Sequence, residues 1–194
     1  MMSTVRLWIA VPLATVMLLA ASEANARDGF RNLYGGLGLF RSMAQYSSES
    51  AESSFNGWGA SIVAGFGVPF GTSSGAFLEG EYGRVDALNT LQSTTYMEKS
   101  VNTFMAGKLG FTFDMFGIGG GAQQNAIDVD NVATIGTSGR SSYKGLNYFG
   151  FVRLTVESKD SFHTILEAKY GNGTFSGLEM SETTLSLRFV FLPF

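Results

Sequence analysis

The sequence predicts a membrane-spanning, antiparallel up-and-down β-barrel of eight strands. Three observations lead to this fold class: a secretory leader, eight later segments in which apolar residues alternate with small or polar ones, and connections that are alternately long and short. Every backbone N–H and C=O must be paired inside lipid. A chain without a long apolar helix after its leader can therefore span a bilayer only as a closed barrel.

Residues 1–26 have the layout of a signal peptide. A short start with one basic residue precedes an apolar run over 7–21, and the Ala-Asn-Ala sequence at 24–26 supplies a small-x-small cleavage pattern. The run is shorter than the roughly 20 residues that a membrane helix needs, and it contains Pro12. We therefore predict that residues 1–26 are cleaved after export and that residues 27–194 form a single barrel domain.

The composition of the mature part agrees with a barrel. All 25 glycines and all 17 phenylalanines follow the leader, which suits many paired strands and poorly suits helices. A net charge of −3 provides no basic patch, so we exclude nucleic acid as a partner. The chain has no cysteine, so an exported protein of this sequence must be held together by hydrogen bonding and burial alone.

Eight segments alternate with a period of two over about ten residues, which is the signal of a strand long enough to span a bilayer when tilted. In one of them Leu146, Tyr148 and Val152 share a face, while Asn147 and Arg153 share the other. The first and fifth segments are the least decisive because small residues occupy both faces. The predicted strands are 32–43, 55–68, 75–85, 99–113, 115–127, 143–156, 161–171 and 183–191.

The connections orient the barrel. Those after the first, third, fifth and seventh segments are long and polar, covering 44–54, 86–98, 128–142 and 172–182. Those after the second, fourth and sixth are short, at 69–74, around Asp114 and at 157–160. Long extracellular loops and short periplasmic turns are typical of outer-membrane barrels and place both termini in the periplasm. A soluble barrel of the lipocalin kind would bury its apolar face inward and would not need this asymmetry.

With this layout the chain resembles the small eight-stranded outer-membrane barrels, the OmpA transmembrane-domain and OmpX/Ail-like group. The resemblance covers residues 32–194 as a pattern of strands and loops. It implies location in the outer membrane of a Gram-negative bacterium and a C-terminal strand that the barrel-assembly machinery reads. The residues that match this signal are Leu185, Leu187, Phe189, Phe191 and Phe194. Pro193 departs from the family pattern, and Phe194 is one residue out of phase with the alternation.

If the apolar faces meet lipid, seven charged residues point into the lumen: Glu79, Glu81, Lys108, Arg153, Glu167, Lys169 and Arg188. An eight-stranded barrel is just wide enough to be filled by side chains, so these charges must be paired. Counting hairpin register from the 157–160 turn places Arg153 near His163 and Ile165, and counting from the 172–182 loop places Arg188 across from Ile165. Both arginines are then diagonal to Glu167, so we predict that Glu167 bridges them. The network is then either a structural plug or a gated proton or ion path.

Four further cations share the lipid-facing parity of their strands and lie at the loop ends: Arg41, Arg84, Lys99 and Lys144. In that position they would meet lipopolysaccharide phosphates of the outer leaflet. Ordinary snorkelling of basic side chains at the interface would give the same sequence pattern.

A catalytic site would have to use His163, the only histidine. Some outer-membrane barrels modify lipid A with a histidine and a serine, and Ser161 and Glu167 share the parity of His163. However, His163 directly follows a predicted periplasmic turn, far from lipid A in the outer leaflet. We therefore expect no enzyme, no catalytic residues, no cofactor and no metal site.

Three functions remain after this reading. The first is a monomeric, non-enzymatic surface barrel whose four loops meet lipopolysaccharide, other cells or a host ligand. The second is a small-solute or ion pore, which a filled lumen disfavours. The third is a lipid A-modifying enzyme.

Overall fold

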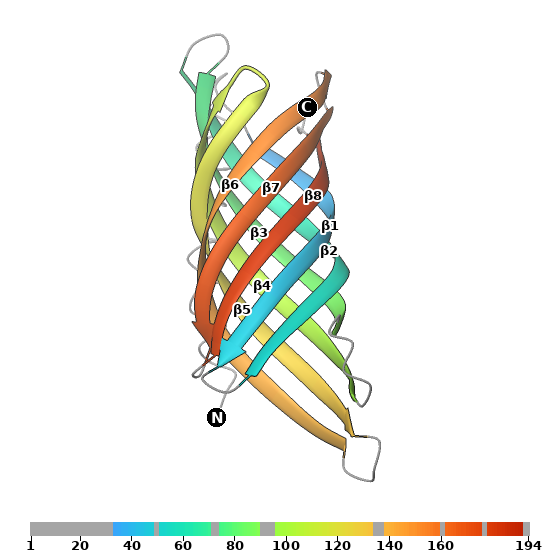
Figure 1. The fold of residues 1–194 in the computed structure, drawn as a ribbon. Coiled ribbons are helices and arrows are strands. Elements are labelled where there is room, and N and C mark those ends of the chain that lie inside the picture. The colour runs from blue at the N-terminus through green and yellow to red at the C-terminus, as the bar shows by residue number, and fades with distance from the viewer. Residues whose placement is uncertain are drawn as a thin grey trace, which may run out of the picture.

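The computed structural model is a closed barrel of eight antiparallel strands in which each strand pairs with the next and β8 pairs with β1 (Figure 1). The strands are β1 (Leu33–Ser48), β2 (Ala51–Pro69), β3 (Ser74–Asn89), β4 (Tyr96–Phe113), β5 (Phe116–Ala133), β6 (Ser138–Lys159), β7 (Phe162–Phe175) and β8 (Leu178–Phe191). The structure describes residues 33–48, 51–70, 74–89, 96–133, 138–159, 162–175 and 178–191. The predicted fold class is confirmed. The predicted signal peptide and the terminal Phe194 lie outside these residues.

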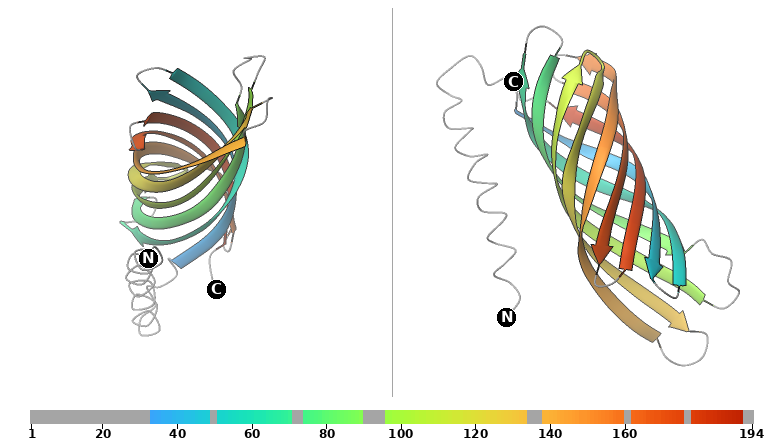
Figure 2. Two further views of the ribbon diagram at one scale, coloured as in Figure 1. Left: turned by 90° about the horizontal axis from the view of Figure 1, so that it is seen from below. Right: turned by 60° about the vertical axis from the view of Figure 1, so that its left-hand side comes forward.

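The stagger of the barrel follows from the strand registers. A path through directly paired residues leaves β1 at Leu37, passes Ile62, continues around the wall through Leu146, and returns to β1 at Ser47, ten residues further on. A shift of this size tilts the strands by roughly 40° to the barrel axis. The oblique course of the strands is plain in Figure 2.

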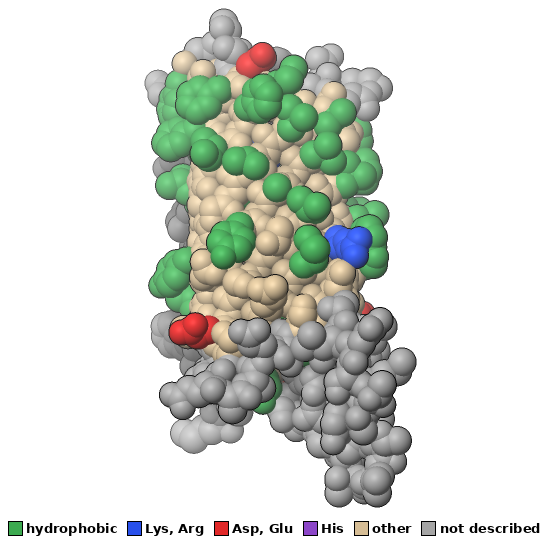
Figure 3. Space-filling view, in the orientation of Figure 1, with side chains coloured by type: hydrophobic (Ala, Val, Ile, Leu, Met, Phe, Trp, Pro, Cys, Tyr) green, Lys and Arg blue, Asp and Glu red, His purple; other side chains and the backbone are tan. Residues whose placement is uncertain are grey.

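Because residues alternate along each strand, the barrel has an apolar outer wall, suited to contact with lipid, and a packed interior. Leu37, Ile62, Leu109 and Val152 are among the large apolar side chains that are more than half exposed on the outside. Figure 3 shows apolar side chains spread over one side of this wall, where charged ones are few. The predicted faces are correct for all eight strands, including the first and fifth.

The predicted loops are much shorter than expected at one end of the barrel. β1 continues to Ser48 and β2 begins at Ala51, so strand pairing replaces most of the predicted 44–54 loop. The other three predicted loops are likewise largely strand, and β5 and β6 project beyond the rest of the barrel (Figure 1). Backbone pairing continues above the apolar belt because polar side chains do not interrupt a hydrogen-bonded ladder.

The opposite end is closed by tight turns. β4 and β5 are joined by Asp114 and Met115 alone, and Asp114 adopts a left-handed conformation with φ of 55°. Aspartate tolerates this region better than most residues, which suits it to a two-residue hairpin.

Aromatic side chains in the lumen pack over glycines of the neighbouring strand. Phe151 is the direct partner of Gly119, and a Cβ built on Gly119 would lie 2.5 Å from the Phe151 ring and 2.2 Å from a backbone oxygen. Phe104 covers Gly83 in the same way. The inward glycines thus create the space that lets large rings fill a narrow barrel.

Candidate functional site

The charged side chains buried within the described residues form a balanced set. Four are acidic and four are basic: Glu79, Glu81, Glu167, Glu182, Lys108, Arg153, Lys169 and Arg188. The strand alternation directs all of them into the lumen. Because opposite charges are equal in number, the interior carries no formal excess charge that would have to be desolvated alone.

Lys108 and Arg188 lie at the centre of this network. Lys108 Nζ is 2.7 Å from oxygens of both Glu81 and Glu167, and 3.5 Å from Glu79. Arg188 donates one hydrogen bond to Glu79 and a second, of 2.7 Å, to Glu81 Oε2. Two cations therefore share three carboxylates, and the cluster connects β3, β4, β7 and β8 through side chains.

Of the two arginines predicted at Glu167, Arg188 contacts it at 3.0 Å. Within the described residues Arg153 does not pair with Glu167, although their Cα atoms are direct partners across β6 and β7. Arg153 instead lies over the Phe77 ring, 3.3 Å from its centroid, and 3.7 Å from Glu79. The predicted Arg153 bridge is wrong, and Lys108 takes its place.

A second polar group lies next to the ion network, towards the end from which β5 and β6 project. Lys169 Nζ donates a 2.6 Å hydrogen bond to Gln123 Oε1, and Gln123 Nε2 donates to Glu182 Oε2 at 3.2 Å. Ser42 donates to the other oxygen of Glu182 at 2.7 Å. The charge network predicted from the sequence did not include Glu182, because this residue was assigned to the end of the 172–182 loop. The even-numbered parity of Arg188 and Thr184, continued back along the chain, would have found it.

Apolar groups close the lumen on both sides of the polar groups. Towards the tight turns, Val63, Ile165 and Val190 form a buried cluster with Tyr34 against it. Towards the other end, Ile127 and Met180 are each 2% exposed and pack with Tyr46 and Tyr143. Within the described residues, the charged centre thus lies between two hydrophobic layers.

On the outer wall, two of the four predicted lipopolysaccharide-binding cations flank one tryptophan. Arg41 is the direct partner of Trp58, lies 5.9 Å from the centroid of its ring, and donates to Asn56 Oδ1 at 3.0 Å. Arg84 pairs with Asp86 at 3.1 Å, and Asp86 is the direct partner of Trp58 on its other side.

The other two predicted cations, Lys99 and Lys144, lie on β4 and β6. Lys144 is exposed on β6, and the side chain of Lys99 lies outside the described residues. The structure therefore brings Arg41 and Arg84 to opposite sides of Trp58, which is 70% exposed.

The barrel has the same fold as several solved structures of other proteins. Ail, the attachment invasion locus protein of Yersinia pestis, aligns with a TM-score of 0.54 at 12% identity over 82% of this chain and 99% of Ail. Neisserial surface protein A aligns with a TM-score of 0.55 at 15% identity, covering 80% of this chain and 95% of that one. The chain has the fold of the small eight-stranded outer-membrane barrels. No protein-family model and no curated protein sequence matches it.

Of the three residues considered for catalysis, the two that the structure describes, His163 and Glu167, form no hydrogen bond or ion pair with each other. His163 lies at the start of β7, paired with Val190 and Ser158, at the end of the barrel where the tight turns lie. The Oε1 atom of Glu167 contacts Lys108 and Arg188. Ser161 lies outside the described residues.

The described part of the chain holds neither a candidate metal site nor a membrane-spanning helix. No group of three or more histidines, aspartates or glutamates there could hold a metal ion. No helix in that part of the chain is long and apolar enough to cross a bilayer.

Proposed function

We propose that this protein is a non-enzymatic, non-conducting barrel of the Gram-negative outer membrane that acts at the cell surface through its four extracellular hairpins. The observation that carries the proposal is the filled, charge-balanced lumen between two apolar layers. An exposed apolar wall around such an interior suits lipid outside and a rigid support inside. What remains for recognition is the end formed by the hairpins β1–β2, β3–β4, β5–β6 and β7–β8.

The ion network disfavours a pore. A conducting path needs water or mobile ions along its length, whereas Lys108 and Arg188 are each at most 2% exposed and engaged by three carboxylates. Opening this path would leave buried charges without partners, at a cost of several kcal/mol each. The pore remains the alternative function.

The partners we propose are outer-membrane lipid and lipopolysaccharide, together with the barrel-assembly machinery during biogenesis. Exposed cations at the level of Trp58 support the lipopolysaccharide contact, since an arginine can pair with phosphate through two hydrogen bonds. A host or cell-surface ligand is a further partner. One structure of Ail holds the heparin analogue sucrose octasulfate, so sulfated glycans belong among the ligands to be tested. We propose that the barrel is a monomer.

Planar-bilayer recording of the refolded mature protein tests the closed lumen. We expect no unitary conductance steps, and regular steps in the wild-type protein would overturn the proposal in favour of the pore. The surface role is tested by cell-binding assays with the β5–β6 hairpin shortened, because this hairpin projects furthest. A variant with the same number of residues removed from the β7–β8 hairpin is the matched control. Binding that is unchanged in both variants would contradict a role for the hairpins.

A further inference from the structure

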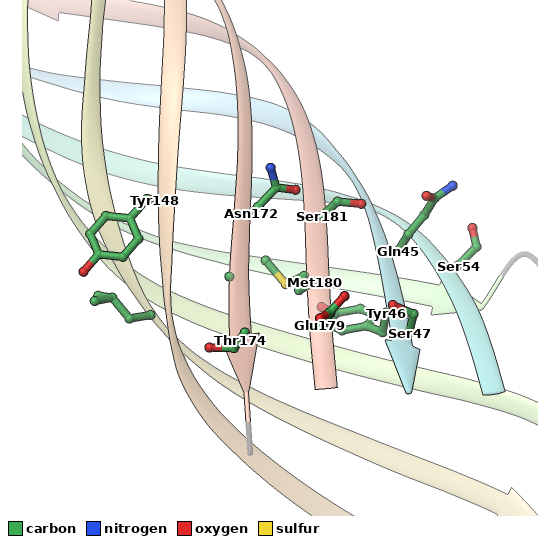
Figure 4. A pocket seen from close by; sticks show the side chains of 12 residues that line it. Gln45, Tyr46, Ser47, Ser54, Tyr148, Asn172, Thr174, Glu179, Met180 and Ser181 are labelled. Carbon is green, nitrogen blue, oxygen red and sulfur yellow. The ribbon is translucent and has the colours of Figure 1, made fainter. Parts of the chain in front are cut away.

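Five outward side chains lie side by side across five adjacent strands. Tyr148 on β6, Asn172 on β7, Ser181 on β8, Gln45 on β1 and Ser54 on β2 are successive Cα partners, and Figure 4 shows them as one row. Together with Glu179 and its neighbours they line a groove of about 740 Å³. This volume falls within the roughly 300–1,000 Å³ typical of small-molecule sites.

The chemistry of the groove is that of a sugar-binding surface. Amide and hydroxyl side chains both donate and accept hydrogen bonds, as the hydroxyl groups of a sugar do. The Tyr148 ring is 65% exposed and offers an apolar face on which the C–H face of a pyranose can stack. Among the described lining residues the only charged side chain is the carboxylate of Glu179. The described lining thus offers no cation to a sulfate or phosphate group.

The groove begins where the apolar wall ends. On β1, Gln45 lies four residues beyond Arg41, and on β2, Ser54 lies four residues before Trp58, so on these two strands the row stands on the hairpin side of the Arg41–Trp58 pair. Further along the same strands the outward residues are apolar, as at Leu39 and Leu185. Because the strands are tilted, this row of paired residues runs obliquely, and at β6 its residue Tyr148 lies four residues to the membrane side of Lys144. The groove therefore faces sideways and extends from the hairpin side of the Arg41–Trp58 pair to the level of the cations predicted at the membrane interface.

We propose that this groove binds neutral sugar units of the lipopolysaccharide core. The inference rests on the outer-membrane location proposed above, because that location surrounds the wall with lipopolysaccharide. A molecule whose phosphates meet Arg41 and Arg84 at the interface carries its core sugars directly outward along this wall. A ligand arriving from another cell would first meet the hairpin tips instead.

The test uses the refolded, full mature chain in detergent. The probe is a neutral core oligosaccharide released from lipopolysaccharide by deacylation and dephosphorylation, with binding followed by saturation-transfer NMR and calorimetric titration. The double variant Tyr148→Ala/Asn172→Ala should weaken binding by about tenfold or more, since both stacking and hydrogen bonding are lost. Thr103→Ala, on the outward face of β4, is the matched control and should bind like the wild type.

The outcomes separate this inference from the proposed function. Absent binding by the wild type, equal binding by the double variant, or tighter binding of sucrose octasulfate in the same groove would each overturn the sugar site. Because the probe is soluble, these results do not depend on where the barrel resides. Heat-modifiable mobility in gels checks that each variant is folded. If the double variant fails to fold, Gln45→Glu supplies the same test, because the added carboxylate should weaken binding without removing a ring.

Discussion

Lys108 on β4 and Glu167 on β7 meet inside the barrel, with Lys108 Nζ donating a hydrogen bond of 2.7 Å to Glu167 Oε1. β5 and β6 separate the two strands along the wall, so the contact crosses the lumen. Arg188 reaches the same carboxylate from β8 at 3.0 Å. One glutamate thus connects β7 with the neighbouring β8 and, across the lumen, with β4, and it supports the wall from within.

Replacing Glu167 by glutamine should therefore destabilise the barrel substantially. The variant Glu167→Gln keeps the shape of the side chain but removes a negative charge that two buried cations share. We expect the free energy of unfolding to fall by about 3 kcal/mol, as measured by urea titration of the refolded protein in lipid vesicles. Asp86→Asn, which removes a carboxylate from an exposed pair, should change it by less than about 1 kcal/mol. Equal effects from the two variants would argue against a buried network.

The inward glycines should be far less tolerant of substitution than the outward ones. A Cβ at Gly119 would meet the Leu109 carbonyl oxygen at 2.2 Å and the Phe151 ring at 2.5 Å, whereas a Cβ at Gly107 has no atom within 4 Å. We expect Gly119→Ala to cost about 1–3 kcal/mol through overpacking. Gly107→Ala should be neutral or slightly stabilising because it reduces the freedom of the unfolded chain. Thermal unfolding followed by gel mobility distinguishes the two, and equal melting of both variants would contradict the packing argument.

The alternation of residues predicted which face of every strand meets lipid, because a bilayer outside and a narrow lumen inside impose opposite demands on alternate positions. The same alternation did not predict how far the strands continue at the hairpin ends. There the outward residues become polar, as at Gln45 and Ser181, so the apolar half of the pattern disappears while the backbone pairing continues. Glu182 was lost from the predicted network for this reason, although its parity agrees with that of Arg188.

Side-chain partners were harder to predict than faces. The predicted register placed Arg153 beside His163 and Ile165, whereas the structure pairs it directly with Glu167. A register shift between Thr155 and Glu157 adds one residue to β6, and β6 itself runs on to Lys159. No sequence pattern marks such a bulge. On the β7–β8 side, where the ladder has no such shift, the predicted pairing of Arg188 with Ile165 is correct.

Removing the outward cations should weaken the retention of lipopolysaccharide. The variant with Arg41, Arg84, Lys99 and Lys144 all changed to glutamine loses the positive charges predicted to meet lipid phosphates. We expect less lipopolysaccharide to co-purify, as measured by phosphate and fatty-acid analysis of the protein extracted in mild detergent. Asp86→Asn releases Arg84 from its ion pair and should leave the amount unchanged or raise it. If co-purification and stability were both unchanged in the fourfold variant, these cations would be ordinary snorkelling side chains without specific contact to lipopolysaccharide.

His163→Ala should leave lipid A chemistry unchanged. His163 lies at the tight-turn end of β7, opposite the hairpins, and no hydrogen bond or ion pair joins it to Glu167, whose Oε1 contacts Lys108 and Arg188 instead. An acyl-transfer or hydrolytic site needs a base within hydrogen-bond reach of its nucleophile, close to the lipid it modifies. Mass spectrometry of lipid A from cells expressing the wild type, His163→Ala or no barrel should therefore give three identical acylation patterns. A change that appears with the wild type and disappears with His163→Ala would establish an enzyme and overturn the non-enzymatic function proposed above.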